Sequence, residues 1–259
     1  MRLRADEQQG LITRLTNKTG EHCPYDAQSM RQVTKLVKRA PEEELMDLPA
    51  HAQAYANADF SEPNSKFVAL FSEKFPGFNH QQILDLGCGP ADITMRLAEQ
   101  YPQAKVIGLD GADAMLEIAG KEILQHSSLT NRVDIRKWHI GRQENPLGSE
   151  GFHAVVSNSL LHHMHDPLDL WRAIRACAAP GAAVLVMDLI RPQSRIEAEN
   201  IVEKYAGKEP ELLRNDFLNS LLAAYRSAEI MAQLVSANME LLQIEIVSDR
   251  HFIVFGSIS

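Results

Sequence analysis

The sequence lacks the features of a secreted, membrane-spanning or zinc-finger protein. It contains three cysteines, an odd number with no Cys-x-x-Cys pair, so neither a disulfide framework nor a zinc finger is predicted. No apolar run approaches the roughly 18 residues that a membrane span needs, and the N-terminus has no apolar core of a signal peptide. We therefore expect no membrane partner and a location in the cytoplasm.

An excess of positive charge is also missing. The chain has 26 Lys and Arg against 34 Asp and Glu, a formal net charge of −8. Binding a nucleic-acid backbone requires clustered cations. One basic group exists at Lys35, Lys38 and Arg39, but the acidic run from Glu42 to Glu44 follows at once, which favours a solvated helix face. A nucleic-acid partner is therefore not expected.

The remaining composition indicates a globular chain. Its 259 residues are 45% hydrophobic, enough for one sizeable core. Residues 1 to about 75 are polar without a clear strand pattern, so we predict a helical N-terminal cap with helices at 28–40 and 63–75. Residues 76–259 are predicted to form the second domain, with a helical insertion at about 192–238.

From residue 82 onward, short β-rich runs alternate with amphipathic stretches, which is typical of βαβ units around a parallel sheet. The expected strands are 83–86, 105–109, 133–138, 152–157 and 182–188, and the expected helices are 91–100, 112–125 and 167–178. Two final strands, 241–247 and 251–256, are joined by Ser248, Asp249 and Arg250. So short a connection permits only an antiparallel hairpin. The predicted fold class is α/β: a doubly wound, seven-stranded, mostly parallel sheet with a terminal antiparallel hairpin strand.

The strongest local signal is a glycine-rich turn between a strand and a helix, Ile83-Leu84-Asp85-Leu86-Gly87-Cys88-Gly89-Pro90. Gly87 and Gly89 allow a backbone geometry and a close ligand approach that a Cβ would obstruct, and the helix start offers free N–H groups. A nicotinamide-binding turn should carry a third glycine at the position of Asp92. Its absence argues against a nicotinamide cofactor.

Asp110 ends the next strand, about 20 residues beyond the glycine turn. A carboxylate at this position can accept hydrogen bonds from both ribose hydroxyls of an adenosine ligand. A strand-terminal Asp also commonly caps a following helix, here the one that begins near Ala112. Asp110 taken alone fits both roles equally well.

A third segment, Val155-Val156-Ser157-Asn158-Ser159-Leu160-Leu161-His162-His163-Met164-His165-Asp166, is followed by a helix and a Pro180-Gly181 turn. With the glycine turn, Leu109-Asp110 and Ala114-Met115-Leu116, it resembles the motif order of class I S-adenosylmethionine (SAM)-dependent methyltransferases. The resemblance covers about residues 82–191, and the final hairpin extends it. The chain is most similar to the group of quinone-ring C-methyltransferases and arsenite methyltransferases.

This resemblance implies that SAM is the cofactor. It places Asp85, Gly87 and Gly89 around the methionine part of SAM and Asp110 at the ribose. Gly111 and Met115 would border the adenine. Family members often bind the adenine amino group through an Asp or Asn after the third strand, for which Gln143 or a backbone carbonyl would substitute. The expected cofactor-binding residues are Asp85, Gly87, Gly89, Asp110, Gly111, Met115, Gln143, Ser157 and Asn158.

Methyl transfer mainly requires alignment of the acceptor with the methyl carbon. If a base assists, His162 or His163 is the best placed candidate, although each of them can instead pack beneath the cofactor. The run of His162, His163 and His165 also suggests a metal, but no carboxylate or cysteine completes a recognisable ligand spacing. No metal site is therefore predicted.

Acceptor selection is expected to lie in the cap and the insertion, because the sheet motifs are committed to the cofactor. Tyr55, Arg191 and Tyr205 are the candidate acceptor-binding residues, with Arg191 assigned to an anionic group. The apolar face of residues 217–222 predicts either packing inside the cap or a homodimer interface. The leading hypothesis is a SAM-dependent methyltransferase of a small organic acceptor, and the alternative is a non-catalytic SAM-binding or nicotinamide-binding protein.

Overall fold

The computed structural model of the chain describes residues 36–42, 45, 47–79, 82–148 and 151–258, and Leu36–Ser259 form one compact unit. Most of the helix expected at 28–40 lies outside the described residues, and residues 36–40 have no regular secondary structure. The predicted domain boundary near residue 75 stays a prediction. No helix in the described part is long and apolar enough to cross a lipid bilayer.

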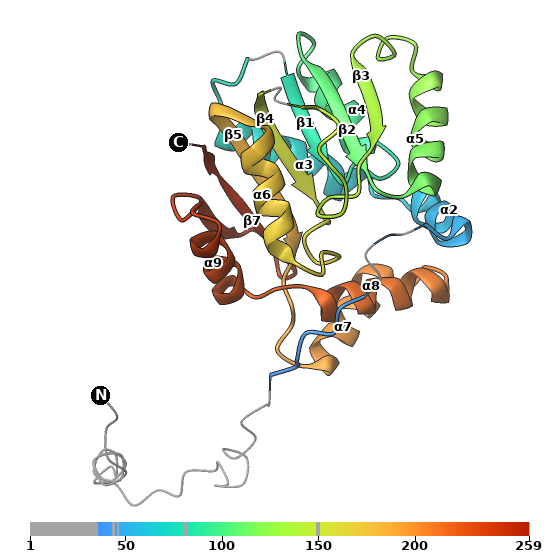
Figure 1. Ribbon diagram of the computed structural model, residues 1–259. Helices are drawn as coiled ribbons and strands as arrows, with labels where there is room; N and C mark the ends of the chain where they lie inside the picture. Colours follow the sequence, from blue (N-terminus) through green and yellow to red (C-terminus); the bar gives the residue numbers. More distant parts are fainter. Residues whose placement is uncertain (1–35, 43–44, 46, 80–81, 149–150, 259) are drawn as a thin grey trace, which may run out of the picture. The chain divides into compact units, whose positions relative to one another are not determined.

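A seven-stranded sheet forms the centre of this unit, in the order β3-β2-β1-β4-β5-β7-β6 (Figure 1). β7 pairs antiparallel with both β5 and β6, whereas the other pairs are parallel. The predicted fold class and the antiparallel terminal hairpin are therefore confirmed. The strands are β1 Gln82–Leu86, β2 Lys105–Asp110, β3 Val133–Lys137, β4 Phe152–Asn158, β5 Ala178–Leu189, β6 Gln243–Ile246 and β7 His251–Ser257.

Both faces of the sheet are buried, because side chains alternate between the two sides of each strand. In β5, Val184 and Val186 pack on one side, and Leu185 and Met187 pack on the other. The first side is covered by α6 (Pro167–Cys177) and α9 (Ser227–Ser236), and the second by α3 (Ser61–Lys74), α4 (Asp92–Gln100) and α5 (Asp113–Gln125). The result is a three-layer α/β/α arrangement, which Figure 1 shows.

Local signals explain where several helices begin. The Asp166 carboxylate accepts a hydrogen bond from the Leu168 N–H, and Pro167 occupies the first turn of α6, where its missing N–H costs nothing. Ser194 caps α7 (Arg195–Ala206) in the same way by accepting from the Glu197 N–H. The predicted helices at 91–100, 112–125 and 167–178 agree with α4, α5 and α6 within one residue at each end.

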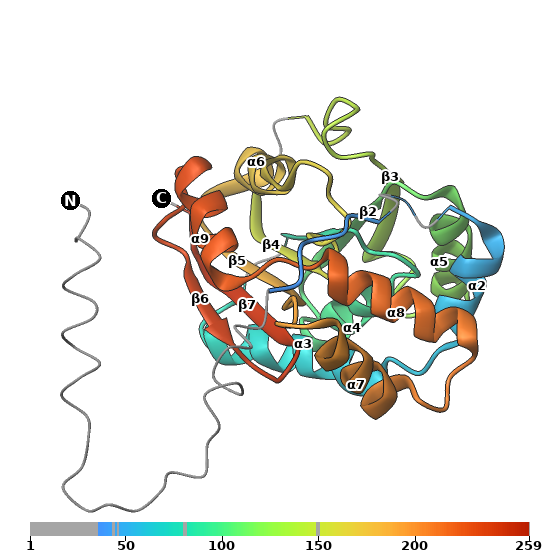
Figure 2. The same ribbon diagram turned by 90° about the horizontal axis from the view of Figure 1, so that it is seen from below.

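The insertion and the N-terminal segment lie at the carboxyl edge of the parallel strands. α7 and α8 (Glu211–Ala223) pack together on a small core that includes Leu189, and α8 reaches α2 (Pro49–Asn57), as Figure 2 shows. Leu221 and Leu222 are buried in this core. Of the two alternatives for residues 217–222, the structure favours packing within the chain.

Candidate active site

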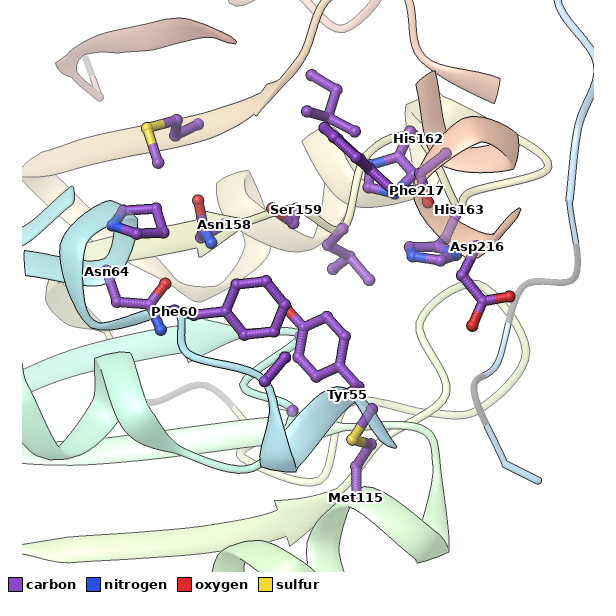
Figure 3. Close-up of a pocket in the computed structure, with 18 of the residues that line it drawn as sticks. Tyr55, Phe60, Asn64, Met115, Asn158, Ser159, His162, His163, Asp216 and Phe217 are labelled. Atoms are coloured by element: carbon purple, nitrogen blue, oxygen red, sulfur yellow. The ribbon is translucent and has the colours of Figure 1, made fainter. Parts of the chain in front are cut away.

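A cavity of about 450 Å³ opens at the carboxyl ends of β1, β2 and β4, and a smaller one of about 150 Å³ adjoins it. This edge includes the point between β1 and β4 where the strand order reverses, which is where open α/β sheets bind ligands. Tyr55, Phe60, Asn64 and Asn158 line both cavities. Figure 3 shows their side chains around the shared space.

The glycine turn forms one wall of both cavities. Gly87 and Gly89 have φ angles of +74° and +53°, in the left-handed region that side chains with a Cβ rarely adopt. A Cβ on Gly87 would approach Leu160 Cδ2 to 2.9 Å, whereas one on Gly89 would meet no atom within 4 Å. Gly87 is therefore required by packing, and Gly89 leaves its backbone open to the cavities.

Asp110 lies between the turn and the start of α5. One carboxylate oxygen accepts the Gly89 N–H at 2.8 Å, and the other accepts the Ala112 N–H at 2.8 Å. Both contacts are structural, as the capping interpretation expects. A carboxylate has about four acceptor positions, however, so Asp110 retains capacity for two further donors on the cavity side.

Asp85 faces the smaller cavity from the end of β1. The Thr94 hydroxyl donates to its Oδ2 atom at 2.7 Å, and only 2% of the residue is exposed. Burial raises the pKa of Asp85 to about 7, with a further contribution from the charge of Asp110. This carboxyl group is therefore poised to ionise when a cation enters the smaller cavity.

The end of β4 brings two polar side chains next to β1. Asn158 lines both cavities, and its buried Oδ1 atom has no hydrogen-bond partner within the described part of the chain. A buried polar atom without a partner is costly, so it indicates a ligand that would donate to it. Ser157 instead donates its hydroxyl to the Leu86 carbonyl at 2.8 Å and does not appear among the described cavity-lining residues. Its expected cofactor contact is replaced by a bond between β4 and β1.

Comparison with known proteins agrees with this arrangement. Residues 84–184 match the family described as a methyltransferase domain. A trans-aconitate 2-methyltransferase of Yersinia pseudotuberculosis is 28% identical over 145 residues, which are 55% of this chain and 51% of that protein. Another, from Deinococcus radiodurans, is 42% identical over 126 residues, which are 49% of this chain and 43% of that protein. The chain spans about half the length of these curated relatives.

Solved structures share the fold over a larger part of the chain. A SAM-dependent methyltransferase from Aquifex aeolicus matches with a TM-score of 0.57 at 16% identity, over 82% of this chain and 99% of that one. The plantazolicin methyltransferase BpumL, solved with S-adenosylhomocysteine (SAH), matches with a TM-score of 0.62 at 13% identity, over 82% and 91% of the two chains. Residues 84–184 are thus similar to the methyltransferase domain family, and the fold around them is that of class I SAM-dependent methyltransferases. SAM is the cofactor of this class, as expected from the sequence, while the quinone and arsenite subgroup stays a prediction.

The methyltransferase domain is covered on its cavity side by α2 and the start of α3. The rings of Tyr55 and Phe60 lie 4.6 Å apart between centroids, and both face the cavity in Figure 3. Burial, with the charge of Asp110, raises the pKa of Tyr55 to about 12, so its hydroxyl stays protonated. Tyr55 was expected at the acceptor, but it lies beside the glycine turn and Asp110 as well. The sequence also indicates that Phe60 could face the pocket, whereas Asn64 was missed because nothing in its spacing distinguishes it from a surface helix residue.

The segment after β3 reaches the cavity with Trp138, His139 and Ile140. Gln143 does not line the cavity; it is exposed, and its Oε1 atom accepts the His139 N–H at 3.0 Å. Its carbonyl accepts from the Trp138 indole at 3.1 Å. Gln143 therefore stabilises this loop and does not line the cavity, where its side chain was expected to contact adenine.

The two candidate catalytic histidines line the larger cavity, and in Figure 3 they lie near Phe217 and Asp216 of α8. The Nδ1 atom of His162 lies 2.6 Å from Asp188 Oδ1, and the rings of His162 and His163 are 4.2 Å apart. Although burial disfavours the charged ring, the contact with Asp188 raises the pKa of His162. Burial likewise opposes ionisation of Asp188, but His162 lowers the pKa of that carboxyl group. Glu42, which sequence reasoning missed, lies beside both histidines.

Arg191 and Tyr205, the other two expected acceptor-binding residues, differ in whether they line the cavity. Arg191 is 3% exposed and does not line the cavity; it donates to the Ala224 carbonyl at 2.6 Å and to Glu229 Oε1 at 2.7 Å. Its expected contact with an anionic acceptor is therefore corrected to a structural tie between β5 and the insertion. Tyr205 does line the larger cavity, and its hydroxyl donates to Asp249.

Proposed function

We propose that the chain is an enzyme that transfers the methyl group of SAM to a small organic acceptor. The observation that carries this proposal is the pair of adjoining cavities, which connect the glycine turn, Asp110 and Asn158 to His162 and His163 within one site. The SAM sulfonium supplies the methyl group, so the protein mainly has to align the acceptor and exclude water. A larger cavity lined mainly by apolar side chains, adjoining a smaller and more polar one at Asn158, suits this task.

The residues present fit SAM in both charge and donor pattern. Asp85 offers a buried carboxyl group that an ammonium group would ionise, and the unpartnered Asn158 Oδ1 would accept a donor. Asp110 has two acceptor positions left for the ribose hydroxyls. Gly111, Met115 and the segment 138–140 line the adjoining wall, where we propose that the adenine binds.

The acceptor is proposed to be neutral or cationic. The described cavity lining includes the carboxylates of Asp59, Glu62, Glu209 and Asp216, against the guanidinium group of Arg250. Arg250 is already stacked 3.4 Å from the Tyr205 ring centroid, and it contacts Asp249. A tricarboxylate such as trans-aconitate would require several cations. The substrate named for the curated relatives therefore does not suit this lining.

The two histidines are proposed to act on the reacting atom of the acceptor, because they line the larger cavity near Phe217 and Asp216 of the insertion. Tyr205 and Phe217 would then border the acceptor. Cys88 and Cys177 are buried free thiols, which supports a reducing compartment such as the cytoplasm.

Calorimetric titration with SAM, SAH and NADH tests the proposal. We expect micromolar binding of SAM, no binding of NADH, and a loss of SAM affinity of about 100-fold in Asp110→Ala, because two charge-assisted hydrogen bonds are removed. The matched control is Asp113→Ala, which removes a carboxylate three residues away that is 69% exposed and pairs with Lys137. Binding of NADH alone, or of none of the three ligands, would overturn the proposed function.

The acceptor class is tested separately by following SAH formation with a panel of phenols, amines and di- and tricarboxylates of similar size. Turnover confined to neutral or cationic compounds supports the charge argument. Turnover of a tricarboxylate at a rate equal to or above that of the other classes refutes it without affecting the proposed methyl transfer.

A further inference from the structure

The acceptor end of the cavity contains a cluster that sequence reasoning did not assemble, formed by Glu42, His162 and His163 and here called the Glu42 cluster. His162 and His163 follow β4, whereas Glu42 comes from the segment 36–42. The Val37 N–H donates to the Gln193 carbonyl at 2.9 Å, and the Ala40 N–H donates to the Leu222 carbonyl at 3.0 Å. These bonds hold the segment against the insertion and bring Glu42 to the histidines.

The distances within the Glu42 cluster suit metal ligands better than hydrogen bonds. Glu42 Oε1 lies 3.5 Å from His162 Nε2 and 3.4 Å from His163 Nδ1. Hydrogen bonds between nitrogen and oxygen span about 2.7–3.2 Å. Two ligands that are each about 2.1 Å from a tetrahedral zinc ion are separated by roughly 3.4 Å. All three ligand atoms lie within 4.8 Å of one another, so one ion can contact each of them after a small adjustment.

The surroundings of the Glu42 cluster fit the second layer of a metal site. Metal-binding histidines usually direct their other ring nitrogen to a carboxylate or carbonyl, which fixes the tautomer and orients the ring. His162 Nδ1 lies 2.6 Å from Asp188 Oδ1, and this leaves Nε2 directed to Glu42. The Ser220 hydroxyl donates to Glu42 Oε1 at 3.1 Å, as expected for a ligating carboxylate.

Charge gives a separate argument. The side chains of Glu42 and Asp188 are 17% and 1% exposed, and burying two carboxylates requires compensating positive charge. Arg39 lies nearby, but its guanidinium group donates hydrogen bonds to the carbonyls of Ala223, His162 and Met164. Within the described residues, the nearby positive charges include that of Arg39, which hydrogen-bonds to neither carboxylate, and that of His162 when it is protonated. A divalent cation bound to neutral His162 would supply the balancing charge in its place.

We propose that Glu42, His162 and His163 bind one divalent transition-metal ion, for which zinc is the best match. Two imidazoles and a carboxylate are a recognised zinc set that leaves a fourth position open. Both histidines line the larger cavity, so the open position faces the acceptor and takes an oxygen donor such as a phenolic hydroxyl. The role toward the acceptor rests on the proposed methyl transfer, whereas metal binding itself does not.

The experiment measures metal binding to the whole chain without SAM. Protein stripped with a chelator is dialysed against limiting Zn²⁺ or Co²⁺, and bound metal is quantified by elemental analysis and by the visible absorption of Co²⁺. We expect one equivalent of metal, and a loss of affinity of about 100-fold or more in Glu42→Gln and His163→Ala. The matched control is His165→Ala, which removes an exposed histidine two residues away and should bind metal like the wild type.

Two outcomes overturn the metal proposal: no stoichiometric metal in the wild type, or unchanged affinity in the Glu42→Gln His163→Ala double variant. Neither variant removes the fully buried His162, and circular dichroism with a thermal melt verifies the fold of each. SAM titration of the stripped protein separates this proposal from the proposed function. If the protein binds SAM but no metal, the metal proposal alone is overturned. If it binds metal but not SAM, only the proposed methyl transfer is overturned.

Discussion

Replacement of Asp85 by Asn should remove a proton-linked part of SAM binding. The Asp85 carboxyl group is 2% exposed and has a pKa raised by burial to about 7. In the ligand-free protein it is therefore largely neutral below pH 7. If the ammonium group of SAM requires the carboxylate, binding must release the Asp85 proton, and affinity must fall as the pH falls.

The size of the effect follows from this pKa. With a pKa of about 7, the dissociation constant for SAM is multiplied by one plus ten to the power (7 − pH), which is about 2 at pH 7 and about 33 at pH 5.5. The affinity should therefore fall about 16-fold between these values. An α-amino group titrates at about 7.7–8.0, so this range leaves the charge of SAM nearly constant.

Calorimetry in two buffers of different ionisation enthalpy measures both the affinity and the protons released. The wild type should release nearly one proton per SAM at pH 6, and Asp85→Asn should release none and show a flat profile. Glu62→Gln is the control, because Glu62 also lines the larger cavity but is exposed. The reasoning is refuted if wild-type affinity changes less than twofold between pH 7 and 5.5 without proton release.

The Asp85 carboxyl group should lower the free energy of unfolding of the ligand-free protein as the pH rises, although a higher pH favours SAM binding. A folded-state pKa of about 7, against an ordinary aspartate pKa of 3.8, means that the folded protein holds this proton more tightly than the unfolded chain. Asp85 therefore costs stability progressively as the pH rises from about 4 to 7, up to about 4 kcal/mol at pH 8. Asp85→Asn should raise the free energy of unfolding of the ligand-free protein at pH 8 and change it little at pH 4. A lower stability of this variant at pH 8 would contradict the assigned cause.

Two further substitutions test contacts away from the cofactor. Trp171→Phe removes the indole that donates to the buried Gln233 Oε1 at 3.0 Å, and should lower the free energy of unfolding, measured by urea titration, by about 2–4 kcal/mol. The control is Leu241→Ala, at a residue 75% exposed, which should change the free energy of unfolding by under about 0.5 kcal/mol. Arg191→Met removes the hydrogen bond to the Ala224 carbonyl and the ion pair with the partly exposed Glu229, and should cost about 2–3 kcal/mol while the calorimetric SAM affinity stays within twofold. A large loss of SAM affinity in a folded variant would restore Arg191 to the binding site.

The sheet could be predicted closely because its signals are local. Each inner strand is a short apolar run that ends at a turn residue, and β1, β2 and β4 begin and end within one residue of the expected bounds. The three-residue connection at 248–250 fixed the direction of β7, since geometry permits nothing but a hairpin. β5 was harder, because its first four residues, Ala178 to Gly181, resemble a turn but pair partly with β4 and continue the strand.

Residues whose partners lie far away in sequence could not be assigned correctly. Arg191 follows a strand at the edge that carries the site, yet it turns to Ala224 and Glu229. Ser157 was expected at the cofactor, but its hydroxyl donates a hydrogen bond to the Leu86 carbonyl of β1. In the sequence Glu42 belongs to an acidic run that favours a solvated face, whereas in the structure the backbone bonds of residues 37 and 40 to the insertion bring it to His162.

The anchoring of Arg39 also has a consequence for the order in which the protein assembles during synthesis. Arg39 Nε donates to a carbonyl 184 residues further along the chain, and its guanidinium stacks on Tyr225 at 4.2 Å. At about 5–20 residues per second, a ribosome needs roughly 10–40 s to produce that partner. The first strands of the sheet therefore emerge long before the segment that carries Glu42 can dock. The acceptor end of the cavity is among the last parts of the nascent chain to take its final form.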